Sequence, residues 1–143
     1  MPIQQLSLFV ENRPGSLSAV CKVLKENNLS IRTLSLADTR EFGILRLLLK
    51  EHEQAKVALE KAGFVVKVTE VLALEVPDCP GGLADILEIL DKHNLSVEYM
   101  YAFTFGVNDK AIIVFRFEDP ARAIAELKNE PIKLIRAADL YKD

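Results

Sequence analysis

The stretch Glu11-Asn12-Arg13-Pro14-Gly15-Ser16-Leu17 decides the fold, because it joins a strand pattern to a helix pattern. Before it, residues 5–10 carry apolar side chains at every second position, as a half-buried strand does. After it, residues 17–24 place apolar side chains at the i, i+3, i+4, i+7 spacing of one helix face. The stretch is therefore predicted to be a strand-to-helix corner, with Pro14 at the first helical position.

Such a corner has the chemistry of a ligand loop. Gly15 lets another group approach the backbone closely, and the N–H groups of Gly15, Ser16 and Leu17 lack partners inside the helix. A helix start of this kind attracts an anion, and the amide of Asn12 can both donate and accept hydrogen bonds. For a single copy of the motif, an ordinary capped corner is the alternative.

The same corner occurs a second time. Pro80-Gly81 follows Pro14-Gly15 by 66 residues. One offset without gaps relates the two copies, and it pairs Leu17 with Leu83, Leu24 with Leu90, and Asn28-Leu29-Ser30-Ile31 with Asn94-Leu95-Ser96-Val97. The chain is therefore predicted to be a tandem duplication, with one domain over residues 1–69 and another over residues 70–143. Domains of this size have small cores, so we expect the two domains to pack against each other.

Composition excludes several classes of protein. Half of the 143 residues are apolar and 27% are charged, which is typical of a globular protein. The net charge of −3 argues against a nucleic-acid partner, and no apolar run approaches the roughly 18 residues of a membrane helix. Residues 1–4 lack the features of a signal peptide, so we expect a cytoplasmic protein. Cys21 is interpreted as a core residue and Cys79 as a loop thiol.

The remaining pattern alternates strands and helices. Further strands are predicted over residues 30–37, 43–49, 64–68, 70–76, 97–105, 111–117 and 133–138, and further helices over 51–61, from 83 and from 120. Each half therefore has the order βαββαβ. This predicts an α+β protein made of two ferredoxin-like units in tandem, each an antiparallel sheet with its helices on one face.

With this order in place, the two corners resemble those of ACT domains, which are small amino-acid-sensing modules. The resemblance to the tandem ACT-domain proteins of bacteria covers essentially the whole chain, and the first half is also similar to the ACT domain in regulatory subunits of acetolactate synthase. It implies an amino-acid-binding regulatory protein that is not an enzyme and needs no cofactor or metal. The partners it implies are a free amino acid and a regulated metabolic enzyme.

The resemblance also implies where the ligand binds. Paired ACT units commonly bind ligand at their interface, with the Pro-Gly corner of one unit facing the second strand of the other. Two sites are therefore expected. One is formed by Asn12, Arg13, Pro14, Gly15, Ser16 and Leu17 with Ser96, Val97, Glu98 and Tyr99, and the other by Asp78, Cys79, Pro80, Gly81, Gly82 and Leu83 with Ser30, Ile31 and Arg32.

The two expected sites differ in chemistry. Asp78 stands where the family usually has Asn, which favours an ammonium group at that corner and disfavours a second anion. Gly82 stands where the first corner has Ser16. We therefore expect unequal sites, of which the second can be empty.

Two alternatives stay open at this point. Acylphosphatase shares the βαββαβ order and cradles phosphate at a corner containing Arg, as Arg13 would, although the matched position in the second half is Cys79. The second alternative is an interaction module that regulates a partner without a small ligand. His93 is interpreted as a cation near a helix C-terminus and not as a catalytic residue, because no catalytic or metal-binding spacing accompanies it.

A homodimer is expected from the sheets. The strands are apolar on both faces, whereas a sheet with helices on one face should alternate, and the residues concerned are Ile44, Leu45, Leu47, Leu48 and Leu49 in one strand and Ile112, Ile113, Val114 and Phe115 in another. Two chains stacked sheet to sheet would bury the second faces. Tyr99, Tyr101, Phe103 and Phe105 line one side of a neighbouring strand, and the alternative for them is the helix-covered side.

Overall fold

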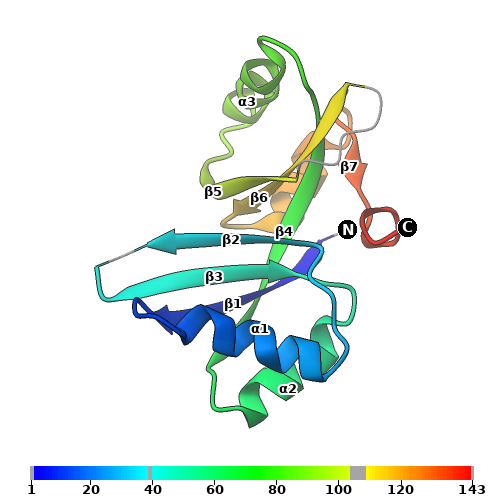
Figure 1. Ribbon diagram of the computed structural model, residues 1–143. Coiled ribbons are helices and arrows are strands. Elements are labelled where there is room, and N and C mark those ends of the chain that lie inside the picture. Colours follow the sequence, from blue (N-terminus) through cyan, green and yellow to red (C-terminus); the bar gives the residue numbers. More distant parts are fainter. Residues whose placement is uncertain (1, 39, 104–108, 143) are drawn as a thin grey trace. The chain divides into compact units, whose positions relative to one another are not determined.

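The computed structural model describes residues 2–38, 40–103 and 109–142 (Figure 1). The elements are, in chain order, β1 (Ile3–Glu11), α1 (Ser16–Glu26), β2 (Thr33–Asp38), β3 (Phe42–Leu48), α2 (His52–Lys61), β4 (Val66–Pro77), α3 (Gly82–Lys92), β5 (Val97–Phe103), β6 (Lys110–Phe117), α4 (Pro120–Leu127), β7 (Leu134–Ile135) and α5 (Ala137–Leu140). Contacts divide the chain into two compact units, Gln4–Thr69, here called the first repeat, and Glu70–Asp143 with Met1–Ile3, here called the second repeat.

Each repeat has the predicted βαββαβ order, and β4 contributes residues to both. The strand order is β2-β3-β1-β4 in the first repeat and β5-β6-β4-β7 in the second. The pairs β1·β3, β2·β3, β4·β6, β5·β6 and β4·β7 are all antiparallel. In the first repeat, α1 and α2 lie on the same face of the sheet (Figure 1). The prediction of two ferredoxin-like α+β units is confirmed.

The core of each repeat joins its helices to one face of its sheet. In the first repeat, Leu8 and Leu45 are directly opposite on β1 and β3, so they point to the same face. Buried residues of the two helices cover that face, and they are Val20, Leu24, Ala55 and Leu59. In the second repeat, the matching residues are Ile86, Leu90, Ala123 and Leu127. The duplicated apolar spacing therefore forms two equivalent cores.

The duplicated asparagines end the first helix of each repeat. Asn28 and Asn94 adopt left-handed φ values of 56° and 54°, a conformation that Asn tolerates better than most residues. The next N–H group then donates back into the helix, from Leu29 to the carbonyl of Leu24 and from Leu95 to that of Leu90, both at 2.9 Å. This turn sends each chain from its helix into the following strand.

Some boundaries differ from the prediction. Cys21 is exposed, because the buried stripe of α1 runs through Val20 and Leu24. The predicted strands over 64–68 and 70–76 are the single strand β4, and residues 30–32 precede β2. The last predicted strand is short, since the chain turns at Arg136 into α5, where the Leu140 N–H donates to the Arg136 carbonyl at 2.9 Å. Residues 104–108, which include the predicted Phe105, lie outside the described residues.

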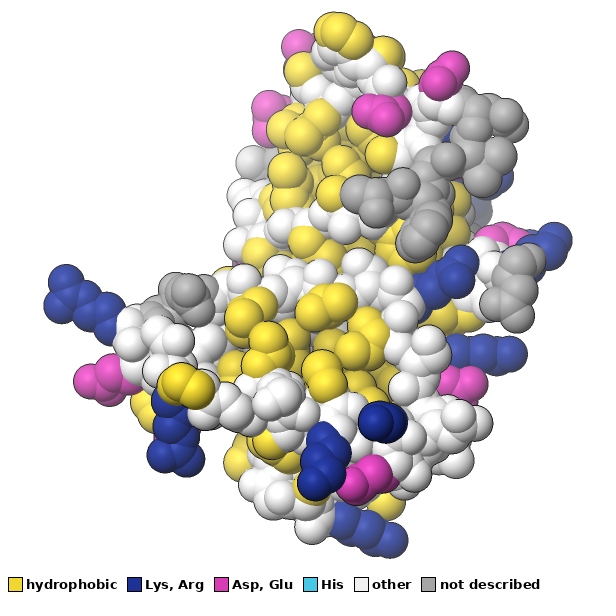
Figure 2. All heavy atoms as spheres, in the orientation of Figure 1, with side chains coloured by type: hydrophobic (Ala, Val, Ile, Leu, Met, Phe, Trp, Pro, Cys, Tyr) yellow, Lys and Arg dark blue, Asp and Glu magenta, His cyan; other side chains and the backbone are white. Residues whose placement is uncertain are grey.

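The second faces of the sheets carry both buried and exposed apolar side chains. Leu48 and Val114 are fully buried, and Tyr101 pairs with Val114 on the face opposite Phe115, so the aromatic side chains of β5 are not on the helix-covered side. Phe9 and Phe42 lie on the sheet face opposite Leu8 and Leu45 and are 64% and 46% exposed, and the other exposed large apolar side chains include Leu17, Leu34, Leu36 and Val65. Figure 2 shows apolar side chains gathered over β2, β3 and α1. The homodimer stays a prediction.

Candidate functional site

The two corners have the same backbone geometry. Gly15 precedes α1 with φ 91°, ψ −18°, and Gly81 precedes α3 with φ 85°, ψ −10°, both in the left-handed region. This conformation cannot continue into a right-handed helix, so α1 begins at Ser16 and Pro14 lies before the cap. The prediction that Pro14 occupies the first helical position was wrong. A Cβ added at Gly15 or Gly81 would meet no atom within 4 Å, so the approach to each corner is open.

Each corner leaves backbone donors at its helix start. The Ser16 N–H donates to the Arg13 carbonyl at 3.3 Å and the Ala19 N–H to the Gly15 carbonyl at 3.0 Å. Between them, the N–H groups of Leu17 and Ser18 have no backbone acceptor in the part of the chain that the structure describes. The second corner repeats this arrangement. The Gly82 N–H donates to the Cys79 carbonyl at 3.0 Å, and the Asp85 N–H donates to the Gly81 carbonyl at 2.9 Å. Two free donors at each corner can therefore receive an anion.

Asn12 and Asp78 connect their corners to the neighbouring hairpins by backbone hydrogen bonds. The Asn12 N–H donates to the Glu41 carbonyl at 2.9 Å, and the Asp78 N–H to the Asp109 carbonyl at 2.8 Å. The side-chain amide of Asn12 also donates to the Arg40 carbonyl at 3.4 Å, which leaves its oxygen as an acceptor. Both residues are exposed. The backbone positions of Asn12 and Asp78 match, and their side chains differ.

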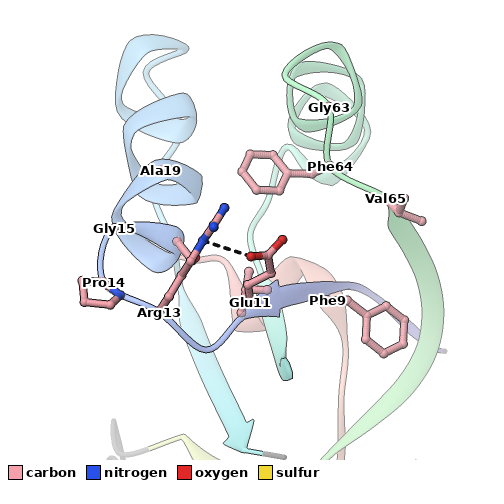
Figure 3. Close-up of a pocket in the computed structure, with 11 residues that line it drawn as sticks. Phe9, Glu11, Arg13, Pro14, Gly15, Ala19, Gly63, Phe64 and Val65 are labelled. Carbon is pink, nitrogen blue, oxygen red and sulfur yellow. Dashed lines mark ion pairs between the residues drawn. The ribbon is translucent and has the colours of Figure 1, made fainter. Parts of the chain in front are cut away.

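A groove opens beside the first corner (Figure 3). Its volume is about 850 Å³, and its lining joins the end of β1 and the start of α1 to residues 63–65 before β4. Phe64 points between the helices, while Phe9 and Val65 lie at the outer side, where they are 64% and 76% exposed. Arg13 Nε forms an ion pair with Glu11 Oε2 at 2.9 Å at the rim of the groove. The groove thus offers one cation and one anion beside apolar walls.

The corresponding groove of the second repeat is smaller and charged. Its volume is about 270 Å³. Glu75, which matches Phe9 by the repeat offset, pairs with Lys110 Nζ at 2.9 Å and with Lys133 Nζ at 3.7 Å. Lys133 directly precedes β7 as Val65 directly precedes β4. Internal ion pairs therefore stand where the first groove has exposed apolar side chains.

Gly82 has a packing role that sequence reasoning missed. A Cβ at this buried position would overlap the carbonyl oxygen of Pro77 at the end of β4. The matching residue of the first corner is Ser16, so a Cβ is accommodated at that position in the first repeat. The only sign of this close approach in the sequence was that residue 82 is a glycine.

The other predicted site residues lie at the opposite end of the first helix of their own repeat. Ser30, Ile31 and Arg32 follow α1, whose 11 residues span about 16 Å. Ile31 packs against the core, and the Arg32 N–H donates to the Leu48 carbonyl at 2.8 Å. In the second repeat, the same place after α3 is taken by Ser96 to Tyr99, where Glu98 pairs with Arg116 Nε at 3.2 Å. That each corner faces these residues of the other repeat stays a prediction.

Within residues 2–38, 40–103 and 109–142, no group of three His, Cys, Asp or Glu side chains could hold a metal ion. No helix among the described residues is long and apolar enough to cross a membrane.

The family model described as "ACT domain pair" matches residues 1–142. Among solved structures, protein BT0572 from Bacteroides thetaiotaomicron is 36% identical with a TM-score of 0.91, covering 100% of this chain and 98% of that one. The ligand-free regulatory subunit of aspartate kinase from Thermus thermophilus is 14% identical with a TM-score of 0.64, covering 87% and 88%. The acetolactate synthase small subunit from Thermotoga maritima is 15% identical with a TM-score of 0.39, covering 92% and 95%. No curated protein matches the sequence.

Proposed function

Because this chain belongs to the ACT domain pair family over residues 1–142, we propose that it is a regulatory protein that binds a free amino acid and performs no chemistry on it. The observation that carries this proposal is the open helix-start corner, which the chain builds twice with left-handed glycines and two free N–H donors each. A carboxylate is the anion of an amino acid that such donors would accept. Aspartate kinase has a regulatory subunit of the same fold, which supports a regulatory role.

The first corner is the better candidate for the principal site. An amino acid carries an ammonium group as well as a carboxylate, so it needs an acceptor and a donor close together. Glu11 and Arg13 supply both at the rim of the groove, and their exposed pair contributes little to stability, so a ligand can replace it at low cost. Phe64, Phe9 and Val65 provide apolar surface for a side chain. In the second groove, Glu75 is already paired with two lysines, and the space is smaller although Ile86 and Ile89 line it.

A thermal-shift screen of the twenty amino acids tests the proposal. A ligand at 100 times its dissociation constant adds roughly 2.7 kcal/mol to the free energy of unfolding, which is readily measured. We expect at least one amino acid to raise the midpoint in the wild type and in the control Lys22→Gln, which changes an exposed residue of α1 away from the groove. Arg13→Gln should reduce the shift. No shift with any amino acid would contradict the proposal.

The exposed apolar side chains favour a second candidate, an interaction module that self-associates or regulates a metabolic enzyme. Leu34 and Leu36, 48% and 45% exposed, lie on β2, the edge strand of the first repeat. Surfaces of this kind mark protein contacts when they are contiguous. Light scattering of the wild type and of Leu36→Lys tests this candidate. A dimer in the wild type and a monomer in the variant would support it, and a monomeric wild type would contradict the homodimer.

The acylphosphatase alternative is disfavoured by the partner of Arg13. The carboxylate of Glu11 lies 2.9 Å from the guanidinium and would repel a phosphate that approached it. Turnover of an acyl phosphate by the wild type, lost in Arg13→Gln, would revive this alternative.

A further inference from the structure

The end of α3 is joined to α4 and to the segment after it by one histidine. His93 caps α3, and its Nδ1 lies 2.9 Å from Glu126 Oε2 on α4. Its Nε2 lies 3.0 Å from Glu130 Oε1, three residues beyond the end of α4. The imidazole and the Glu130 carboxylate are only 19% and 15% exposed. Both ring nitrogens are therefore engaged by carboxylates in a largely covered position.

This geometry requires a proton on each ring nitrogen. A neutral imidazole has one N–H donor, whereas an ionised carboxylate only accepts. Both contacts are therefore hydrogen bonds together only when His93 is an imidazolium. The bond to Glu130, followed by the bond to Glu126, raises the pKa of His93 above its ordinary value of 6.5. The bond from His93, followed by the bond from Lys92, lowers the pKa of Glu130 below its ordinary value of 4.5.

Other charged groups surround the cluster without replacing His93. Lys92 Nζ lies 3.0 Å from Glu130 Oε1, and Arg122 Nη2 on α4 donates to the His93 carbonyl at 3.1 Å. Asp119 is occupied at the start of α4, where it accepts from the Arg122 N–H at 3.1 Å. Lys92 is 67% exposed, so water screens its attraction for Glu130. Only His93 contacts both carboxylates, and only His93 changes charge near neutral pH.

We propose that His93, Glu126 and Glu130 form a proton-dependent clamp that holds the end of α3 to α4 and to the segment leading into β7, and that loosens when His93 loses its proton. The described residues of the first repeat form no such clamp, since the matching residue Asn27 donates to the Val23 carbonyl of its own helix at 2.8 Å. The clamp also reaches the second groove, because Pro131, the neighbour of Glu130, lines it. Proton release would therefore loosen one wall of that groove.

The direction of both pKa shifts fixes the pH range of the clamp. The raised pKa of His93 means that its contribution to stability is complete below pH 6.5 and is lost as the pH rises through the folded-state pKa. The lowered pKa of Glu130 means that its contribution is complete above pH 4.5 and is lost as the pH falls through its folded-state value. The clamp is thus strongest between these two values and weakens towards alkaline pH.

Two NMR measurements on the full chain test the clamp. The first is the titration of the His93 ring, with the signal identified by its loss in His93→Gln. We expect a midpoint above 6.5 that moves down in both Glu126→Gln and Glu130→Gln, because each change removes one bond to the imidazolium. A midpoint at or below 6.5, or one that neither variant moves, would overturn the proposal.

The second measurement is amide hydrogen exchange from about pH 5.5 to about pH 9, corrected for intrinsic exchange rates. The amides of Glu130 and Ile132, which donate within this segment at 3.1 and 2.7 Å, should lose protection as His93 deprotonates. In His93→Gln, the loss should already be present at low pH. The amides of Gly63 and Phe64, at the same place in the first repeat, serve as internal controls without a step. Protection that follows the same pH course in wild type and His93→Gln would contradict the clamp.

Discussion

The two grooves of this chain share a backbone and differ in chemistry. Both lie beside a left-handed glycine at the start of a helix, and both are lined by the segment that precedes the last strand of their repeat. In the first, Phe9 and Val65 are exposed, whereas Glu75 and Lys133 form an ion pair at the matching places of the second. The two repeats share the corner but differ in a few side chains. The first groove is open, whereas the charged side chains of the second groove pair with one another. Backbone geometry alone therefore does not make two equal sites.

The largest effect should come from Gly82. Gly82→Ala places a Cβ against the carbonyl oxygen of Pro77, and overpacking of this kind costs about 2–3 kcal/mol because β4 and α3 must separate. The matched control is Ser16→Ala in the first repeat, for which we expect a change within about 0.5 kcal/mol. Urea unfolding measures both. Equal losses of stability in Gly82→Ala and Ser16→Ala would contradict the close contact between residue 82 and the Pro77 carbonyl.

The left-handed glycines come next. Gly15→Val and Gly81→Val should each lower the free energy of unfolding by about 1–2 kcal/mol, because a β-branched residue is strained at positive φ although the space around each Cβ is open. Gly15→Asn should cost less, since Asn tolerates this conformation. Thermal unfolding of the three variants makes the comparison. If Gly15→Asn lowered the free energy of unfolding as much as Gly15→Val, strain at positive φ would not explain the loss.

The smallest effect should come from the ion pairs of the second groove. Glu75→Gln removes the partner of Lys110 and Lys133, and partly exposed pairs of this kind contribute about 0.2–1 kcal/mol. The loss should shrink at high salt, because salt screens the interaction. Chemical unfolding at low and high salt measures it, with Lys56→Gln, which breaks the exposed pair to Glu60 in the first repeat, as the control. A loss that salt does not change would show that the pair acts by packing.

Much of the fold follows from the sequence, because periodicity and repetition report on the core. Leu24 and Leu90, which the offset pairs, are both buried, and α4 begins at Pro120 as predicted. The sequence-based prediction was wrong at two positions where the periodic pattern does not determine the local geometry. Cys21 fits the helix spacing but lies beside the buried stripe, and Pro14 resembles a helix start until the φ of Gly15 is known.

The candidate site was less predictable, because grooves form from residues that are distant in the sequence. The corner itself was recognised from Pro14-Gly15, but residues 63–65, which complete the groove, carry no motif. The side chain of Asn12, the expected ligand group, donates to Arg40 across the hairpin instead of lining the groove. His93 was interpreted as a helix-end cation, and only the fold brings Glu126 and Glu130 to its ring.

The central claim is that the first groove, and not the second, binds an amino acid. Titration calorimetry with the amino acid that raises the thermal midpoint most tests it directly, using the wild type, Arg13→Gln and Glu75→Gln. We expect one ligand per chain in the wild type, an affinity that falls in Arg13→Gln because a charged hydrogen bond is lost, and no change in Glu75→Gln. Two ligands per chain, or an affinity that depends on Glu75 and not on Arg13, would contradict the claim.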